Sequence, residues 1–247
     1  MFTIQDNQIT FVDGRFYGDG EGNYFPSVTT VLEAYPKSPE YYQWLKEVGD
    51  NADTIRDDAG RRGSVVHALT EQYDKWQEVQ LIGANGTPLY SLKEWAMFER
   101  YVDFTTRFNP EHIKIEETIV SQAIGVGGTI DRVSVINGKR FLIDIKTSKG
   151  IYNHYWLQLA AYREMLNEPV DAVAILWLNA KTRTVKENQG IGWQLVSIED
   201  TTHELNLFRA THALWLEENK NAKPKNFSYN LKPKKNVKTK ETSSILS

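Results

Sequence analysis

Cysteine is absent from this chain of 247 residues. Without thiolates the chain cannot hold a cysteine-bound iron–sulfur cluster, so that cofactor is excluded. The sequence also lacks the glycine-rich phosphate loop that ends in Gly-Lys-Ser or Gly-Lys-Thr, and we expect no ATP-driven step. No apolar run approaches the ~20 residues that span a bilayer, and we expect no membrane partner. The first residues, MFTIQDNQ, have neither secretory nor transit character, which favours a cytoplasmic location.

Acidic residues are missing from a long stretch near the C-terminus. Between Asn219 and Lys240 there are eight lysines and no Asp or Glu, which leaves 29 − 8 = 21 basic against 32 acidic residues elsewhere, or −11. We expect residues 219–247 to form a disordered basic tail that either binds phosphates or keeps the protein soluble. Residues 1–218 are long enough for a single folded domain.

Helical and strand-like patterns alternate along this domain and predict an α/β fold. Residues 26–108 are mainly helical in pattern, residues 112–198 are mainly strand-like, and residues 2–25 favour an N-terminal hairpin. The expected helices are 27–34, 40–81 with breaks near Gly49 and Gly60, 91–108, 153–167 and about 200–218. The expected strands are 112–121, 126–136, 139–146, 171–179 and 192–198.

A tight turn is predicted at Asn137-Gly138. This dipeptide is the strongest short-range hairpin signal, because a type I′ turn needs positive φ at both central residues. Residues 129–136 and 139–146 should therefore pair as antiparallel strands. The pairing matters because these two strands carry the acidic residues of a candidate site.

Two carboxylates and a lysine lie on the paired strands. Asp131 is on the first strand, and Asp144 and Lys146 share one face of the second because side chains alternate along it. The carbonyl group of Ile145 lies between them. Mg²⁺ prefers about six oxygen ligands and keeps several waters, so two carboxylates, one carbonyl and phosphate oxygens suffice to hold it. This combination is typical of a site that cleaves phosphodiester bonds, in which Lys146 orients the water or the phosphate.

The helix that follows adds two polar side chains. Gln158 and Tyr162 are four residues apart and therefore lie on one face of the predicted helix. We expect the amide and the phenol to contact the DNA backbone near the cleaved bond.

These fragments, taken in order, resemble the PD-(D/E)XK nuclease superfamily and specifically its RecB-like branch. They are Pro26-Ser-Val-Thr-Thr-Val-Leu32, Arg62-Gly-Ser-Val-Val-His67, Gly-Thr-Ile-Asp131, Asp144-Ile-Lys146-Thr-Ser and Gln158-Leu-Ala-Ala-Tyr162. The order is similar to that of mitochondrial genome maintenance exonuclease and its phage and bacterial relatives. The resemblance implies a restriction-endonuclease-like core, in which a central mixed sheet is flanked by helices, with a helical N-terminal region over the active site.

The resemblance also assigns roles to residues upstream of the paired strands. His67 is expected to join Asp131, Asp144 and the Ile145 carbonyl as a metal ligand. Arg61 and Arg62 precede it directly and are expected to contact phosphates of the DNA.

Acidic residues near this ligand set are further candidates. Glu71, one turn after His67, either orients the histidine by a hydrogen bond or faces water. Either Glu116 or Glu117 can add a carboxylate, because only one of two successive strand residues faces inward. Of the two, Glu117 is the candidate that we carry forward.

The function that these expectations favour is that of a Mg²⁺- or Mn²⁺-dependent DNA exonuclease. Its substrate would be single-stranded DNA or DNA with a free end, and its setting would be recombination, repair or phage DNA processing, with recombination or replication proteins as partners. Three alternatives stay open: a structure-specific endonuclease of the same fold, a nucleic-acid-binding module without activity, and a metal-dependent hydrolase of another substrate such as a nucleotide or RNA. A bacterial or phage-infected cell is the expected source.

Overall fold

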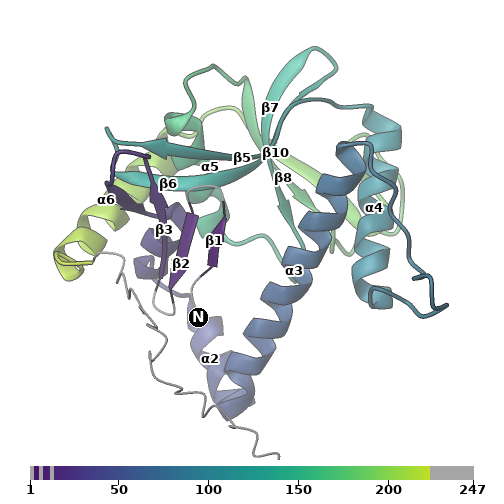
Figure 1. Ribbon diagram of the computed structural model, residues 1–247, viewed down its shortest axis with the longest axis horizontal. Helices are drawn as coiled ribbons and strands as arrows, with labels where there is room; N and C mark the ends of the chain where they lie inside the picture. The colour runs from purple at the N-terminus through teal and green to yellow at the C-terminus, as the bar shows by residue number, and fades with distance from the viewer. Residues whose placement is uncertain (1–2, 6–7, 12–13, 223–247) are drawn as a thin grey trace, which may run out of the picture.

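A six-stranded sheet forms the centre of the computed structural model, which describes residues 3–5, 8–11 and 14–222 (Figure 1). Its strand order is β5-β6-β7-β8-β10-β9, in which β7 and β8 are parallel and the other neighbours are antiparallel. The strands are β5 (Glu111–Ser121), β6 (Val126–Ile136), β7 (Lys139–Lys146), β8 (Ala172–Trp177), β9 (Gln189–Gly190) and β10 (Trp193–Ile198). The predicted α/β fold with a central mixed sheet is therefore confirmed, and only the short β9 was missed among these strands.

Helices cover both faces of this sheet. On β7, Leu142 enters a core with α5 and α6, whereas its neighbour Ile143 enters a second core with α3 and α4. Val173 and Ala174 on β8 divide in the same way, as expected from alternating side chains. Burying one large aliphatic side chain contributes about 1.5–3 kcal/mol, so the two cores hold the helices in place. The helices are α1 (Val28–Val31), η1 (Leu32–Ala34), α2 (Pro39–Val48), η2 (Gly49–Asn51), α3 (Ala52–Asp74), α4 (Leu92–Phe108), α5 (Asn153–Met165) and α6 (Thr202–Glu218).

The helical region 40–81 differs from its prediction in two respects. The break at Gly49 is present, where φ is 54°, but α3 continues without interruption through Gly60. A single glycine costs a helix only about 1 kcal/mol, and the buried face of α3 compensates for it. The helix ends at Asp74 and not at residue 81, because the chain turns at Trp76, whose φ is 57°. This end matters for the site, since Asp74 takes part in a buried ion cluster.

A second, four-stranded sheet packs near one edge of the first. The predicted N-terminal hairpin is part of it, and the short helix predicted over residues 27–34 is present as α1 and η1 with Ser27 as its cap. The Tyr17 hydroxyl lies 3.2 Å from the Thr129 hydroxyl of β6, and Ser27 forms an isolated bridge with Gly127. These contacts attach the N-terminal strands to β6. The strands are β1 (Thr3–Gln5), β2 (Gln8–Phe11), β3 (Gly14–Gly18) and β4 (Tyr24–Pro26).

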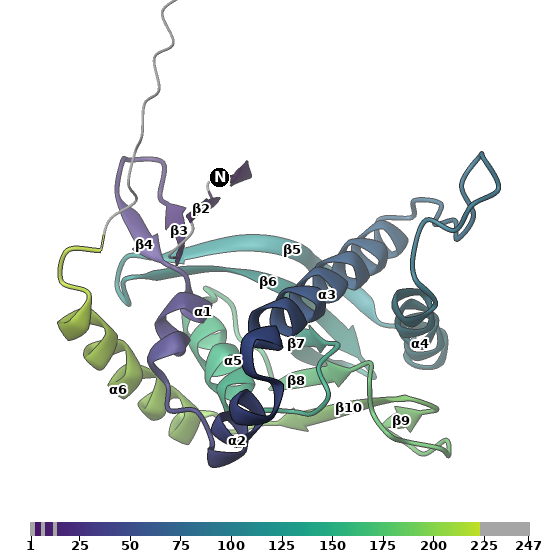
Figure 2. The ribbon, with the colours of Figure 1, turned by 90° about the horizontal axis from the view of Figure 1, so that it is seen from below.

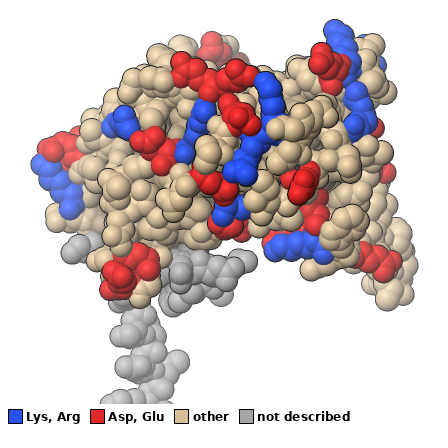
Figure 3. All heavy atoms as spheres, turned by 90° about the horizontal axis from the view of Figure 1, so that it is seen from above, with Lys and Arg blue, Asp and Glu red and all other residues tan. Residues whose placement is uncertain are grey.

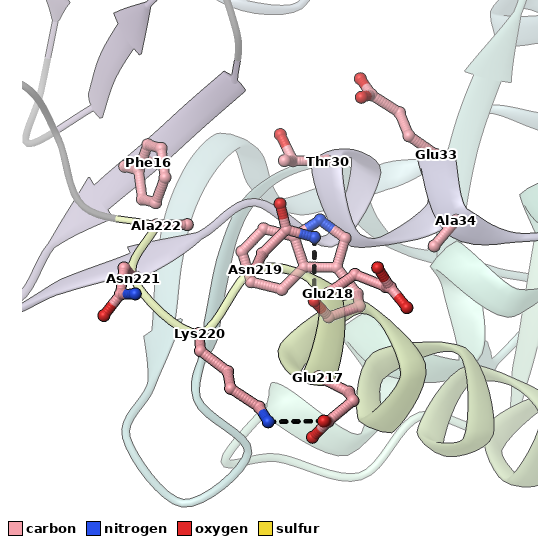
Figure 4. A pocket seen from close by; sticks show the side chains of 11 residues that line it. Phe16, Thr30, Glu33, Ala34, Glu217, Glu218, Asn219, Lys220, Asn221 and Ala222 are labelled. Carbon is pink, nitrogen blue, oxygen red and sulfur yellow. Dashed lines mark hydrogen bonds and ion pairs between the residues drawn. The ribbon is translucent and has the colours of Figure 1, made fainter.

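The described chain ends beside a hollow of about 780 Å³ that lies between β3, η1 and the last turn of α6 (Figure 4). Glu33, Glu217, Glu218 and Trp215 are among the residues that line it. The predicted basic tail lies outside the described residues from position 223 onward. Among the helices that the structure describes, none is long and apolar enough to cross a membrane.

Gly128 allows a test of how tightly α5 packs on β6. A Cβ atom at this position would lie 2.4 Å from Cε1 of the Tyr162 ring. We expect Gly128→Ala to lower the free energy of unfolding by about 1–3 kcal/mol, measured by urea denaturation. The matched control is Gly60→Ala in α3, where nothing lies within 4 Å of the added atom, and it should raise the same free energy by about 0.5–1 kcal/mol. Equal stability of Gly128→Ala and the wild type would contradict this packing, and adding Tyr162→Leu should recover part of the loss.

Candidate metal centre

Two strands and one helix bring three ligand-type groups together. Oδ2 of Asp131 on β6 accepts a hydrogen bond of 2.6 Å from the backbone N–H of Ile145 on β7. His67 on α3 reaches both residues: its Nε2 lies 2.9 Å from the Ile145 carbonyl oxygen, and its Nδ1 lies 3.5 Å from Oδ1 of Asp131. Figure 2 shows α3 passing in front of β7, as these contacts require. The fold thus assembles three predicted ligands that are far apart in the chain.

A buried glutamine joins Asp144 to Lys146. The Gln158 amide donates to Oδ1 of Asp144 and its Oε1 accepts from Nζ of Lys146, both at 3.1 Å. Nζ of Lys146 also lies 2.7 Å from Oδ2 of Asp144, but that oxygen has no hydrogen bond of good geometry among the described residues. We expected Gln158 to contact the DNA backbone, yet its side chain is buried and holds the acid and the lysine in position. Oδ2 of Asp144 therefore has the Lys146 ammonium group as its neighbour, and a bound metal would share this carboxylate with the lysine.

Glu116 is the additional carboxylate of the cluster. Ligand atoms of His67, Glu116 and Asp131 all lie within 4.8 Å of one another. Glu117, the residue that we carried forward from the sequence, instead pairs with Lys114 at 2.5 Å. Simple alternation failed here because the β5–β6 register shifts between residues 112 and 114 and because Glu116 has a φ of 50°. A left-handed residue turns its side chain away from the regular pattern of a strand.

A fully buried arginine, Arg132, forms an ion pair with the Glu116 carboxylate, and the sequence analysis missed it. Arg132 donates from Nη1 to Glu116 at 3.0 Å and from Nε to Asp74 at 2.6 Å. It also donates to the backbone oxygen of Asp131 at 2.6 Å and to the Thr70 hydroxyl at 3.1 Å. The Arg132 side chain therefore links α3, β5 and β6 next to the candidate metal ligands. The only signal in the sequence was a charged residue directly after Asp131 in an otherwise apolar strand.

The charges of the cluster shift one another's pKa values. Burial raises the pKa of Asp144 to about 6, although Lys146 opposes the shift. Burial likewise raises the pKa of Asp131, against the charge of His67. Burial alone would lower the pKa values of His67 and Lys146, but nearby carboxylates outweigh it: Asp131 and Glu116 raise the pKa of His67 to about 9, and Asp144 and Asp131 raise that of Lys146. Negative charge thus dominates the surroundings of both bases.

The two arginines that precede His67 have different environments. Arg61 donates to Oε1 of Glu94 at 3.1 Å, and Glu94 in turn forms the capping box at the start of α4. Arg62 has no ion pair among the described residues, and its Nε is buried without a hydrogen-bond partner. Arg61 therefore has a structural partner, whereas Arg62 has no acidic partner among the described residues.

Two other predicted residues have structural partners. Glu71 pairs with Lys75 at 2.6 Å along α3, so of its two alternatives the hydrogen bond that orients His67 is not formed. Tyr162 is buried, with its ring over Gly128. It lies beside Gln158, as its place on the helix predicts, and burial raises the pKa of its phenol, with a further contribution from the charges of Asp144 and Asp131.

The donor set fits a divalent metal ion. It offers carboxylates from Asp131, Asp144 and Glu116, the carbonyl of Ile145, and the imidazole of His67. Oxygen donors of this kind suit Mg²⁺, and one added imidazole is compatible with Mn²⁺ as well. The observation that supports the fit best is that ligand atoms of His67, Glu116 and Asp131 all lie within 4.8 Å of one another.

A mixed sheet with one buried carboxylate in the middle of β6, a second near the end of β7 and a lysine beside the second is typical of enzymes that cleave phosphodiester bonds. Residues 29–228 match the family model of the PD-(D/E)XK nuclease superfamily. The match spans most of the chain, which therefore belongs to this superfamily and is a nuclease. The predicted resemblance to the superfamily and its restriction-endonuclease-like fold are confirmed, while membership of the RecB-like branch stays a prediction.

Solved structures show weaker similarity. An alkaline exonuclease from Laribacter hongkongensis has a TM-score of 0.40 and 11% identity, over 78% of this chain and 87% of that chain. A protein called SSO0001 has a TM-score of 0.30 and 16% identity, over 49% and 58% of the two chains. Can2 from Sulfobacillus thermosulfidooxidans, solved with cyclic tetra-adenylate, has a TM-score of 0.22 and 12% identity, over 65% and 53%. No curated protein sequence matches the chain.

Proposed function

We propose that this nuclease is a metal-dependent DNA exonuclease that acts on a strand with a free end. Nucleases of this superfamily use divalent metal ions, and we propose Mg²⁺, with Mn²⁺ as a substitute. The observation that carries the exonuclease proposal is the position of α3. This helix of 23 residues supplies His67 and lies against the strands that carry Asp131 and Asp144 (Figure 2). A long helix in this place can cover a passage through which a strand of DNA is threaded from its end.

Each residue of the cluster has a distinct task in this proposal. Asp131, Asp144, Glu116, His67 and the Ile145 carbonyl would hold the metal. When bound, a divalent metal polarises a phosphate oxygen and lowers the pKa of an attacking water.

Three other side chains act on the substrate or on the ligands themselves. Lys146 donates from Nζ to a phosphate oxygen and stabilises the negative charge that develops there. Gln158 holds the side chains of Lys146 and Asp144 in position, because its Oε1 accepts a hydrogen bond from Lys146 and its Nε2 donates one to Asp144. Arg62, which has no carboxylate partner, is the candidate for a contact to a neighbouring phosphate.

On the face that Figure 3 shows, blue and red side chains lie next to one another, and neither sign dominates. A polyanion would meet both signs on this face, so its binding there would depend on individual contacts. We propose that the tail contributes sequence-independent affinity by neutralising phosphates.

Cleavage of linear and circular single-stranded DNA tests the proposal. With Mg²⁺, we expect the wild-type protein to degrade the linear strand and to leave a covalently closed circle of the same sequence intact, because a threaded strand needs an end. EDTA should stop the reaction, and Mn²⁺ should support it. Equally fast cutting of the circle would favour the endonuclease alternative. Absence of cleavage of either DNA with both metals would favour a binding module, and cleavage of RNA alone would indicate another substrate.

A further inference from the structure

Three aromatic rings form a cluster beside Lys146, at the start of α5. Nζ of Lys146 is 4.6 Å from the centroid of the Tyr155 ring. The Tyr155 and His154 centroids are 4.5 Å apart, and His154 stacks with Tyr152 at 5.8 Å and an interplanar angle of 7°. Tyr152 also meets the edge of Tyr155, at 5.5 Å between centroids and an interplanar angle of 74°, so each ring of the cluster contacts the other two.

The rings of this aromatic cluster differ in burial. Tyr155 packs against the core that lies between α5 and the sheet, so it has a structural role. Tyr152 does not belong to that core, and 47% of it is exposed. A large exposed aromatic residue held parallel to a second ring has a defined orientation without being covered by the protein. Such a surface suits a planar ligand.

The aromatic cluster offers neutral rings to a base and has lysine charge beside it for a phosphate. Burial, Lys37 and Lys146 lower the pKa of His154 to about 4, so the imidazole is neutral at neutral pH and offers a π-face. The first turn of α5 contains no acidic residue, and no side chain caps it. A nucleotide can therefore place its base on the rings and its phosphate toward Lys146 without meeting a carboxylate of this helix.

We propose that Tyr152 and His154 form a stacking platform for an unpaired nucleobase of the substrate, next to the phosphate that Lys146 contacts. The inference rests on the proposed function and adds to it the form of the substrate. A base inside a duplex has both faces covered by its neighbours, whereas an unpaired base has a face open for an aromatic side chain. The platform thus selects single-stranded over double-stranded DNA at this position, with little sequence preference, because every base has a π-face.

Equilibrium binding of the full-length chain to a fluorescent single-stranded oligonucleotide in EDTA tests the platform without any need for cleavage. Tyr152→Ala should weaken binding by about 5- to 100-fold, in line with base-aromatic stacking. Tyr152→Phe should bind within about twofold of the wild type, because it keeps the ring. The control is Tyr24→Ala on β4, a tyrosine of similar exposure (39%) that lies outside the aromatic cluster, and it should have no effect. A blunt duplex should bind equally well to the wild type and to Tyr152→Ala.

A second measurement shows whether loss of base stacking causes the weaker binding of Tyr152→Ala. Single abasic sites are introduced along the oligonucleotide, and one position should weaken wild-type binding but leave Tyr152→Ala unchanged. Unchanged binding by Tyr152→Ala, an equal loss in Tyr152→Phe, or no sensitive abasic position would each overturn the platform, as would failure of the wild type to bind the single strand. Mg²⁺-dependent cleavage by the wild type is measured separately. A chain that cleaves but shows no Tyr152 effect refutes the platform alone, and one that shows the effect but never cleaves refutes the proposed function alone.

Discussion

Asp144→Asn is expected to slow single-turnover cleavage of linear DNA with Mg²⁺ at least about 100-fold. The substitution keeps the size of the side chain but removes a negative charge and one oxygen from the proposed ligand set. Metal-assisted charge stabilisation is worth several kcal/mol, and each 1.36 kcal/mol corresponds to a factor of ten in rate. Asp131→Asn should have a comparable effect, because its carboxylate lies 3.5 Å from His67 in the same cluster. The measurement is the decay of an end-labelled strand at saturating protein, with DNA binding expected to survive.

A matched control separates loss of the ligand from loss of charge alone. Asp200→Asn also removes one carboxylate, but Asp200 is exposed and accepts a hydrogen bond from the Thr202 N–H, which an asparagine oxygen can also accept. Its cleavage rate should equal that of the wild type. The site assignment is wrong if Asp144→Asn melts normally and still cleaves at more than about a tenth of the wild-type rate, a loss of under 1.4 kcal/mol in the barrier.

The second large effect concerns stability. Arg132→Met is expected to lower the free energy of unfolding by about 3–5 kcal/mol, because it removes the buried guanidinium that pairs with both Asp74 and Glu116 and leaves each of them only a histidine partner. The Arg132 and Asp74 side chains are 1% and 2% exposed, so water cannot replace the lost partner. Burial alone would raise the pKa of Asp74, but His112 and Arg132 hold it below its ordinary value. Urea denaturation at neutral pH gives the free energy directly.

An exposed ion pair provides the comparison. Lys139 and Glu199 are 3.1 Å apart with side chains 61% and 74% exposed, and Lys139→Met should cost no more than about 1 kcal/mol. Adding Asp74→Leu to Arg132→Met should recover part of the loss, since it removes one of the stranded charges. A cost for Arg132→Met as small as that for Lys139→Met would mean that the buried cluster does not hold α3 to the sheet.

What could be predicted from the sequence was mainly local. The Asn137-Gly138 turn fixes the register of β6 and β7, in which residue 136 pairs with residue 139. That register follows from backbone conformations that few dipeptides accept, so Asp131 and Asp144 could be placed on paired strands without a structure. Lys146 followed from alternation along one of those strands.

The partners of the site residues could not be predicted in this way. Arg132 meets Asp74 across 58 residues of sequence, and Arg61 meets Glu94 across 33. Neither pairing leaves a periodic pattern, because a buried salt bridge needs only two side chains that the tertiary fold happens to bring together. Glu116 was missed in favour of its neighbour for a related reason, since an irregular backbone breaks the alternation on which the choice was based.

The difference between near and distant contacts has a consequence for the newly made chain. The β6–β7 hairpin closes through a two-residue turn, and hairpins form in about 1–10 μs. His67, in contrast, reaches Ile145 only when α3 docks across 78 residues of sequence, a slower step because distant segments must meet first. A nascent or partly unfolded chain therefore has the acids without the histidine, and we expect it to cleave nucleic acids more slowly than the folded protein. On this expectation, full activity appears only after α3 has docked on the sheet.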